Sequence, residues 1–199
     1  GGEKTMIASP HDAMAKGIGM VHQEFMLLPG FSITENIKLN REISKQSVVS
    51  RILGKNLETL DMQTMAEDAR KALDSVGMSI DEYTRVEGMP VGYMQFVEIA
   101  REIDKTGIKL LVFDEPTAVL TPQETEKLFA VLRRMREDNK TVIIITHKLH
   151  EVLSLSDRVS VLRKGEYVGT VITAETNESQ LTEMMVGKKI ELNIDRSEP

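Results

Sequence analysis

Two adjacent carboxylates, Asp114 and Glu115, end an apolar run over residues 108–113 and are followed by Pro116. A short apolar run bounded by breakers is typical of a strand buried on both faces of a parallel sheet. Ligands bind at the carboxyl ends of such strands, and neighbouring side chains on a strand point to opposite faces. The two acids are therefore expected to have different tasks, one at a metal ion and one at a water. The alternative is a strand-end turn with two solvated acids.

Three more residues suited to chemistry stand at the ends of predicted elements. They are Gln23 after a strand over 18–22, Gly92 at the start of a helix reaching about residue 104, and His147 after a buried strand over 141–146. Each is weak evidence alone, and a histidine at a strand end is more often structural. Their order along the chain, taken with the acid pair, favours one composite site.

The elements that position these residues can be predicted from capping and periodicity. A capping residue followed by proline marks helix starts at Ser9-Pro10 and Thr121-Pro122, and Ser32 to Glu35 predicts a capping box. The spacing of apolar and turn residues predicts the rest: helices over 62–76, 148–155 and 178–186, and a hairpin of strands 158–162 and 166–171. The strand–helix–strand order from 108 to 146 predicts a βαβ unit.

Residues 31–105 are predicted to be mostly helical with no clear strand. Within them, the polar stretch over 41–60 leaves a mobile loop and a marginal helix as alternatives. We therefore expect an α/β fold in which residues 1–30 and 106–199 form a parallel-sheet core and residues 31–105 form an inserted α-helical subdomain.

The bulk composition narrows the class of protein. The chain has 199 residues, 41% of them hydrophobic and 28% charged, enough for one sizeable core. The absence of cysteine excludes disulfides and thiolate metal sites, and no run of 18 uncharged apolar residues would span a membrane. A net charge of −6 without a basic cluster argues against nucleic acid as the main partner. No signal-peptide pattern occurs, so a cytoplasmic location is expected.

In its motifs the chain resembles the ATP-binding subunits of ABC transporters over essentially its whole length. The matching segments are GMVHQE (19–24) for the Q-loop, LLVFDEP (110–116) for the Walker B strand, TAVLT (117–121) for the D-loop and ITH (145–147) for the H-loop. Residues 9–13 and 114–122 are most similar to subunits of sugar and nucleoside importers. The resemblance implies a P-loop NTPase (RecA-like) core.

The resemblance also implies roles around bound ATP and Mg²⁺. Asp114 would hold Mg²⁺ through its water shell, and Gln23 would be a second ligand that senses the γ-phosphate, since this hard cation prefers oxygen donors. Glu115 would polarise the attacking water as a general base. His147 would contact the γ-phosphate and hold Glu115 and the water in line.

The family's signature segment would meet the nucleotide of a second subunit at a helix N-terminus. Its counterpart is residues 89–99, in which Val91, Gly92 and Gln95 are the expected nucleotide-contacting residues. Pro90 stands where the family has a serine, and proline offers neither a hydroxyl nor a backbone N–H. Losing such a donor to phosphate would cost roughly 1.5–3 kcal/mol, so weakened hydrolysis is expected. The alternative is that Pro90 only fixes the entry turn of the helix.

A phosphate cradle of the form G-x-x-x-x-G-K-[ST], which the family has before the Q-loop, is absent from this sequence. Two explanations stay open. The chain is a fragment that lacks the N-terminal part of the usual fold, with ATPase activity expected only for the intact subunit, or it is a degenerate, non-hydrolysing domain for dimerisation or regulation. The tail from Glu191 resembles the linker that follows a first ATP-binding domain.

The resemblance implies several partners on the inner face of the cell membrane. They are transmembrane permease subunits, a second ATP-binding domain in a head-to-tail dimer and, indirectly, a solute-binding protein. Residues 24–29 and the helical subdomain would dock on the permease. Phe25, Met26 and Leu27 are the apolar residues expected at that contact, with local core packing as an equal alternative.

Overall fold

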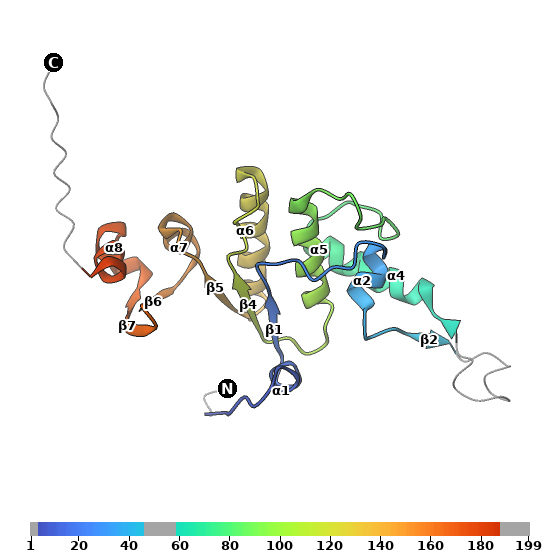
Figure 1. Cartoon of the computed structure of the whole chain (residues 1–199), viewed down its shortest axis with the longest axis horizontal. Coiled ribbons are helices and arrows are strands. Elements are labelled where there is room, and N and C mark those ends of the chain that lie inside the picture. Colours follow the sequence, from blue (N-terminus) through green and yellow to red (C-terminus); the bar gives the residue numbers. More distant parts are fainter. Residues whose placement is uncertain (1–3, 46–58, 188–199) are drawn as a thin grey trace, which may run out of the picture. The chain divides into compact units, whose positions relative to one another are not determined.

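The computed structural model describes residues 4–45 and 59–187, and the chain divides into two compact units, residues 1–145 and 146–199 (Figure 1). The elements of the first unit are α1 (Pro10–Ala15), β1 (Ile18–Val21), α2 (Ile33–Lys38), β2 (Ser44–Lys45), β3 (Thr59–Leu60), α4 (Met62–Ser75), α5 (Val91–Ile103), β4 (Leu110–Asp114), α6 (Pro122–Glu137) and β5 (Thr141–Ile145). The helix starts predicted at Ser9 and Thr121 and the capping box at Ser32 are confirmed.

The core of the first unit is a three-stranded parallel sheet in the order β1-β4-β5, with the acid-bearing strand β4 in the centre (Figure 1). Val21 of β1 pairs with Phe113 of β4, which pairs in turn with Ile144 of β5. The helix α6 connects β4 to β5, so the predicted βαβ order is confirmed. Because the strands are parallel, their carboxyl ends meet at one edge of the sheet.

The sheet is well buried on one face only, which corrects the expectation that β4 and β5 are buried on both faces. Leu111 and Phe113 of β4 are fully buried, on the face where α5 packs against Gly19. Side chains alternate along a strand, so Ile143 and Ile145 of the edge strand β5 point to the other face, where they are 45% and 49% exposed. An apolar strand sequence therefore does not guarantee burial at the edge of this sheet.

Residues 31–105 form a helical region in which α2, α4 and α5 pack together. Every residue from 95 to 100 is buried, so α5 is a central helix rather than one with a single apolar face. The prediction of no strand in this region was wrong, because β2 and β3 form a short antiparallel pair. Two-residue strands have no periodic pattern to detect. The proposed subdomain boundaries at 31 and 105 stay a prediction.

Buried charges join the three helices of this region. Lys38 at the end of α2 is 5% exposed, and its Nζ lies 2.9 Å from carboxylate oxygens of both Asp68 in α4 and Asp104 after α5. Arg41 pairs with Asp104 at 2.8 Å. Buried charges are stable only when they are paired and hydrogen-bonded, so this network fixes how α2, α4 and α5 meet.

The second unit contains α7 (Leu149–Leu155), the antiparallel strands β6 (Arg158–Arg163) and β7 (Glu166–Ile172), a 3₁₀ turn (Thr173–Glu175) and α8 (Glu178–Val186). The predicted hairpin is confirmed, and its turn residues Lys164 and Gly165 have φ values of 52° and 81°, as a type I′ turn requires. Val161 and Leu181 are buried between hairpin and α8. Most of the stretch expected as a loop or helix over 41–60, and the tail from Glu191, lie outside the described residues.

Candidate functional site

Three of the predicted site residues stand at the carboxyl edge of the sheet in the first unit. Strand β4 ends at Asp114 and continues into Glu115, while β1 ends two residues before Gln23. Pairing of Val21 with Phe113 aligns the two strand ends. Gln23 and the acid pair therefore leave neighbouring strands at the same edge, which is where open parallel sheets bind ligands.

The backbone of Glu115 is strained. Its φ is +45°, in the left-handed region that residues other than glycine occupy at a cost of about 1–3 kcal/mol. Its N–H donates to the carbonyl of Ile145 at 2.9 Å, and its carbonyl accepts the N–H of Ala118 at 3.1 Å. Such strain is concentrated at functional sites, which favours a functional acid pair over a solvated strand-end turn.

Asp114 and Gln23 are the predicted metal ligands, and Asp114 is half-buried while Gln23 is exposed. Mg²⁺ commonly takes one or two carboxylates and keeps several waters and phosphate oxygens. In residues 4–45 and 59–187, no group of three or more His, Cys, Asp or Glu side chains is placed to hold a metal ion. The donor set fits Mg²⁺ bound together with phosphate better than a cage of protein ligands, and the assignment stays a prediction.

His147 belongs to the second unit, in the loop that follows β5 and precedes α7. Its side chain is exposed. The hydroxyl of the preceding Thr146 accepts the N–H of Lys148 at 3.1 Å, which shapes the backbone on both sides of the histidine. Convergence of His147 with the acids of the first unit stays a prediction.

The N-terminus of α5 carries the three residues expected to contact a nucleotide. Pro90 is the N-cap residue and makes no side-chain cap, although its carbonyl accepts two N–H groups of the first turn. Val91 is 44% exposed, whereas Gly92 is buried and Gln95 is 2% exposed. Val91 therefore stands at an accessible helix start and Gln95 inside the unit. Their nucleotide contacts stay a prediction.

Gly92 has a steric reason to be glycine within its own chain, because a Cβ there would overlap the carboxylate of Glu124 in α6. Glu124 is held by its capping box, in which Oε2 accepts the N–H and the hydroxyl of Thr121, both at 2.8 Å. These bonds lower the pKa of Glu124 and favour its charged form. A carboxylate near a helix N-terminus is stabilising, so Glu124 compensates in part for the absent side-chain cap at Pro90.

The residues expected to dock on a permease need correction. Leu27 is 6% exposed and belongs to the core, as the alternative of local packing proposed, whereas Met26 and Leu28 are 58% and 40% exposed. Phe25 is half-buried. Side chains alternate along an extended segment, so three consecutive apolar residues do not face one surface. Met26 and Leu28 are the exposed apolar pair.

Sequence reasoning missed three polar residues that hold this segment, namely Asn36, Glu98 and Arg101. Asn36 is 0% and Glu98 1% exposed, and both hydrogen-bond the backbone of the segment. A detectable signal existed for Glu98, because it is the one charged residue in the otherwise apolar stretch 96–100. A carboxylate at such a position needs a dedicated partner.

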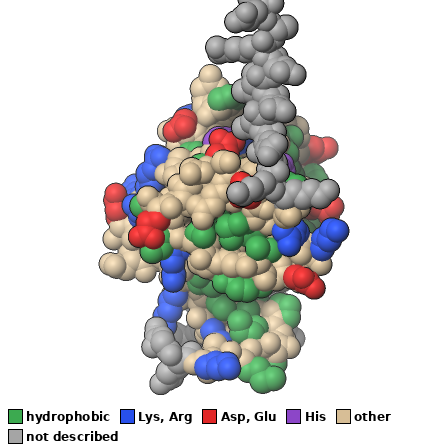
Figure 2. Space-filling model, turned by 90° about the vertical axis from the view of Figure 1, so that its left-hand side faces the viewer, with side chains coloured by type: hydrophobic (Ala, Val, Ile, Leu, Met, Phe, Trp, Pro, Cys, Tyr) green, Lys and Arg blue, Asp and Glu red, His purple; other side chains and the backbone are tan. Residues whose placement is uncertain are grey.

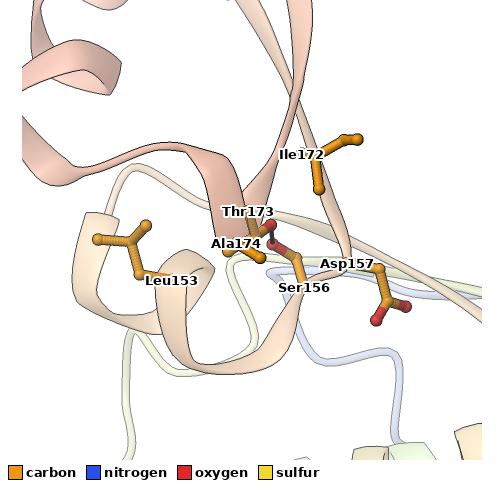
Figure 3. A pocket seen from close by; sticks show the side chains of 6 residues that line it. All are labelled: Leu153, Ser156, Asp157, Ile172, Thr173 and Ala174. Atoms are coloured by element: carbon orange, nitrogen blue, oxygen red, sulfur yellow. Dashed lines mark hydrogen bonds between the residues drawn. The ribbon is translucent and has the colours of Figure 1, made fainter.

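The second unit has a hollow of about 420 Å³ (Figure 3), lined by Leu153, Ser156, Asp157, Ile172, Thr173 and Ala174. The hydroxyls of Ser156 and Thr173 are hydrogen-bonded at 2.9 Å. None of the predicted site residues lines this hollow. The hairpin also exposes Leu162 and Tyr167, by 71% and 66%, and Figure 2 shows a face of the molecule on which hydrophobic side chains lie among acidic and basic ones.

The parallel sheet with its βαβ unit and its acid pair at the carboxyl edge fits the core of the P-loop NTPase fold, without the N-terminal part of that fold. Solved structures share this fold, among them two of the same cassette, MJ0796. A dimeric ATP-binding cassette in a post-hydrolysis state, bound to ADP and Pi, has a TM-score of 0.65 at 22% identity and is matched over 83% of this chain and 68% of its own. A dimeric bacterial ABC transporter cassette has a TM-score of 0.64 at 23% identity, over 81% and 65%.

The ABC transporter family profile (ABC_tran) matches residues 3–118, more than half of the chain, and the chain belongs to this family. The ribose import ATP-binding protein RbsA 1 of Streptomyces avermitilis is 39% identical over 198 residues, covering 100% of the chain and 35% of that protein. The glucose import ATP-binding protein TsgD13 of Haloferax volcanii is 37% identical over 214 residues (98% and 38%). The nucleoside import ATP-binding protein NupA of Lactococcus lactis subsp. cremoris is 37% identical over 189 residues (95% and 35%). The chain thus spans little more than a third of these relatives.

None of the helices in the described part of the chain is long and apolar enough to cross a membrane.

Proposed function

We propose that this chain is part of an ATP-binding subunit that hydrolyses Mg·ATP to drive import of a sugar or a nucleoside. The observation that carries the proposal is the acid pair at the end of β4, with Glu115 held in a strained turn by its bond to Ile145. The ribose, glucose and nucleoside import names of three relatives support the substrate class.

The residues of the site divide the chemistry among them. The side-chain oxygens of Asp114 and Gln23 are the proposed ligands of Mg²⁺, which would neutralise part of the phosphate charge when bound. Glu115 polarises the attacking water as general base. The turn that ends β4 fixes the point from which this carboxylate reaches out. The proposed role of His147 is to contact the γ-phosphate and to help hold Glu115 and the water in line.

The working assembly is a head-to-tail dimer of two ATP-binding domains on the inner face of the membrane. In this dimer the nucleotide of the opposite domain is contacted by three residues, Val91, Gly92 and Gln95. The permease docks against the exposed side chains of Met26 and Leu28, and a solute-binding protein acts indirectly through the permease. The core formed by residues 1–30 and 106–199 and the helical subdomain of residues 31–105 are the proposed domains.

The test of this function is Glu115→Gln in the full-length subunit assembled with its permease. Removal of a general base is expected to lower turnover by about 10²–10⁴-fold, while Mg·ATP binding by titration stays within about threefold of wild type. Glu126→Gln, an exposed acid on α6, is the matched control and leaves turnover unchanged. Unchanged turnover in Glu115→Gln contradicts the base assignment.

A second candidate function, a non-hydrolysing ABC-type domain for dimerisation or regulation, is favoured by Pro90 at the start of α5. Its ring supplies neither a hydroxyl nor an N–H, and no side chain caps this helix. The full-length wild-type subunit would then bind Mg·ATP without turnover. Pro90→Ser separates the two functions, because it raises turnover only where the missing hydroxyl limits hydrolysis.

A further inference from the structure

The extended segment Met26–Leu28 is bound to α5 through both backbone polar groups of Met26. The N–H of Met26 donates to Oε1 of Glu98 at 2.6 Å, and the carbonyl of Met26 accepts from Arg101 at 3.1 Å. Glu98 and Arg101 also pair with each other at 2.8 Å. One residue of the segment is therefore held from two sides by one helix.

Asn36 of α2 holds Leu28 in the same way. Its Oδ1 accepts the N–H of Leu28 at 2.7 Å, and its Nδ2 donates to the carbonyl of Leu28 at 3.1 Å. The same Nδ2 donates to the carbonyl of Ser32 at 2.9 Å, so both ends of the amide are engaged. The segment is thus tied to two helices, at alternate residues.

The contacts made by Glu98 and Asn36 are partly buried, whereas the hydrogen bond from Arg101 to Met26 is exposed. Glu98 is 1% exposed and the side chain of Arg101 14% exposed. Burial raises the pKa of Glu98, and the charge of Arg101 acts in the opposite direction. Separating Arg101 from Glu98 would leave the buried carboxylate without its compensating charge, which is costly. This cost opposes separation of the pair. Meanwhile the Leu27 side chain is buried between these two anchor points, with 6% exposure.

We propose that Asn36, Glu98 and Arg101 are positioning residues that make residues 26–28 a rigid extension of α2 and α5. A partner that presses on the exposed side chains of Met26 and Leu28 then moves the N-terminus of α5, with Gly92, as one body. The identity of that partner, an apolar cytoplasmic helix of the permease, rests on the proposed function. The hydrogen bonds that form the link are independent of it.

Hydrogen exchange on the full-length subunit tests the link. Arg101→Met removes a charged hydrogen bond and half of an ion pair, so exchange in residues 24–30 is expected to speed up by about tenfold, and exchange in residues 89–95 rises with it. Lys105→Met is the matched control, because Lys105 lies just after the C-cap of α5 and pairs with Glu102. Faster exchange confined to residues 24–30 overturns the proposal. If Arg101→Met does not fold, Arg101→Lys is measured in its place.

Turnover is the second measurement, because a purely structural role of Arg101 would leave the permease-stimulated kcat unchanged. In the subunit assembled with its permease, Arg101→Met is expected to reduce the permease-stimulated part of kcat by about fivefold or more, with KM for ATP within about twofold of wild type. Full stimulation in this variant overturns the proposal. If the wild-type subunit shows no turnover, the proposed function has failed. Hydrogen exchange in residues 89–95 of Arg101→Met then tests the link between residues 26–28 and α5 without it.

Discussion

The N–H of Glu115 donates to the carbonyl of Ile145 across 2.9 Å, and this bond ties the turn behind the acid pair to the last residue of β5. The bond holds Glu115 at a φ of +45°, a conformation that a free chain would leave. The strained turn lowers the stability of the folded protein but fixes the position of the Glu115 carboxylate. Active sites commonly combine these two effects. The strain and the proposed base role can therefore be separated by substitution.

Glu115→Gly is expected to be more stable than Glu115→Ala, by about 1 kcal/mol, because only glycine adopts positive φ without a steric cost. Both variants lose the carboxylate, so the comparison isolates the backbone. Urea unfolding of the two proteins measures the difference, and both are expected to lack turnover. Equal stability of the two variants would show that the turn is not strained.

Gly92→Ala is expected to cost about 1 kcal/mol of stability, because the new methyl group displaces the Glu124 carboxylate and breaks its capping box with Thr121. Glu124→Ala loses the same box directly. The double variant should therefore be no less stable than Glu124→Ala alone, and a double-mutant cycle in urea unfolding measures the coupling. Additive losses would mean that Gly92 is required for another reason.

Much of the edge of the sheet could be predicted from the sequence, because an apolar run, two acids and Pro116 encode a strand end locally. The capping box at Ser32 and the helix start at Thr121 are equally local and were predicted correctly. The burial of β5 was not predictable in this way, since it depends on which elements cover the sheet. The sequence could single out Glu98 as a carboxylate in an apolar stretch, but not its partner Met26, which lies 72 residues away. Asn36 bonds Leu28 without a capping pattern that would mark the pair.

The open face of β5 predicts tolerance to polar substitution. Ile143 is 45% exposed, so Ile143→Thr in the 199-residue chain should change stability by no more than about 0.5 kcal/mol, the usual range at surface positions. It should also reduce binding of the dye ANS, which reports exposed apolar surface. Phe113→Leu, at the buried centre of the same sheet, is the contrasting variant and should cost clearly more. A large loss in Ile143→Thr would mean that this face is covered.

Lys38→Met is expected to destabilise the protein by about 3 kcal/mol, because it leaves Asp68 and the buried Asp104 without their shared ammonium. The matched control is Lys71→Met, since Lys71 pairs with the same Asp68 but its side chain is 76% exposed. Exposed pairs contribute only about 0–1 kcal/mol. Denaturant unfolding compares the two variants, and equal losses would contradict a buried network.

Asp68 gives this network a defined pH dependence. The hydrogen bond from Lys38 lowers the pKa of Asp68 below its ordinary value of 3.8, so the folded protein favours the carboxylate more than the unfolded chain does. The resulting stabilisation is fully present above about pH 5 and is lost as the pH falls through the lowered pKa. Asp68→Asn keeps Lys38 paired with Asp104 but removes this titration.

Wild type should therefore exceed Asp68→Asn in stability near pH 6, and the difference should shrink on acidification to about pH 3. Urea unfolding at both pH values measures it, and taking the difference between the two proteins removes the contributions of acids outside the network. A difference that stays constant with pH would mean that Lys38 does not favour the ionised form of Asp68. The contact between α2 and α4 would then depend on apolar packing, with Ile37 and Met65 among its buried residues.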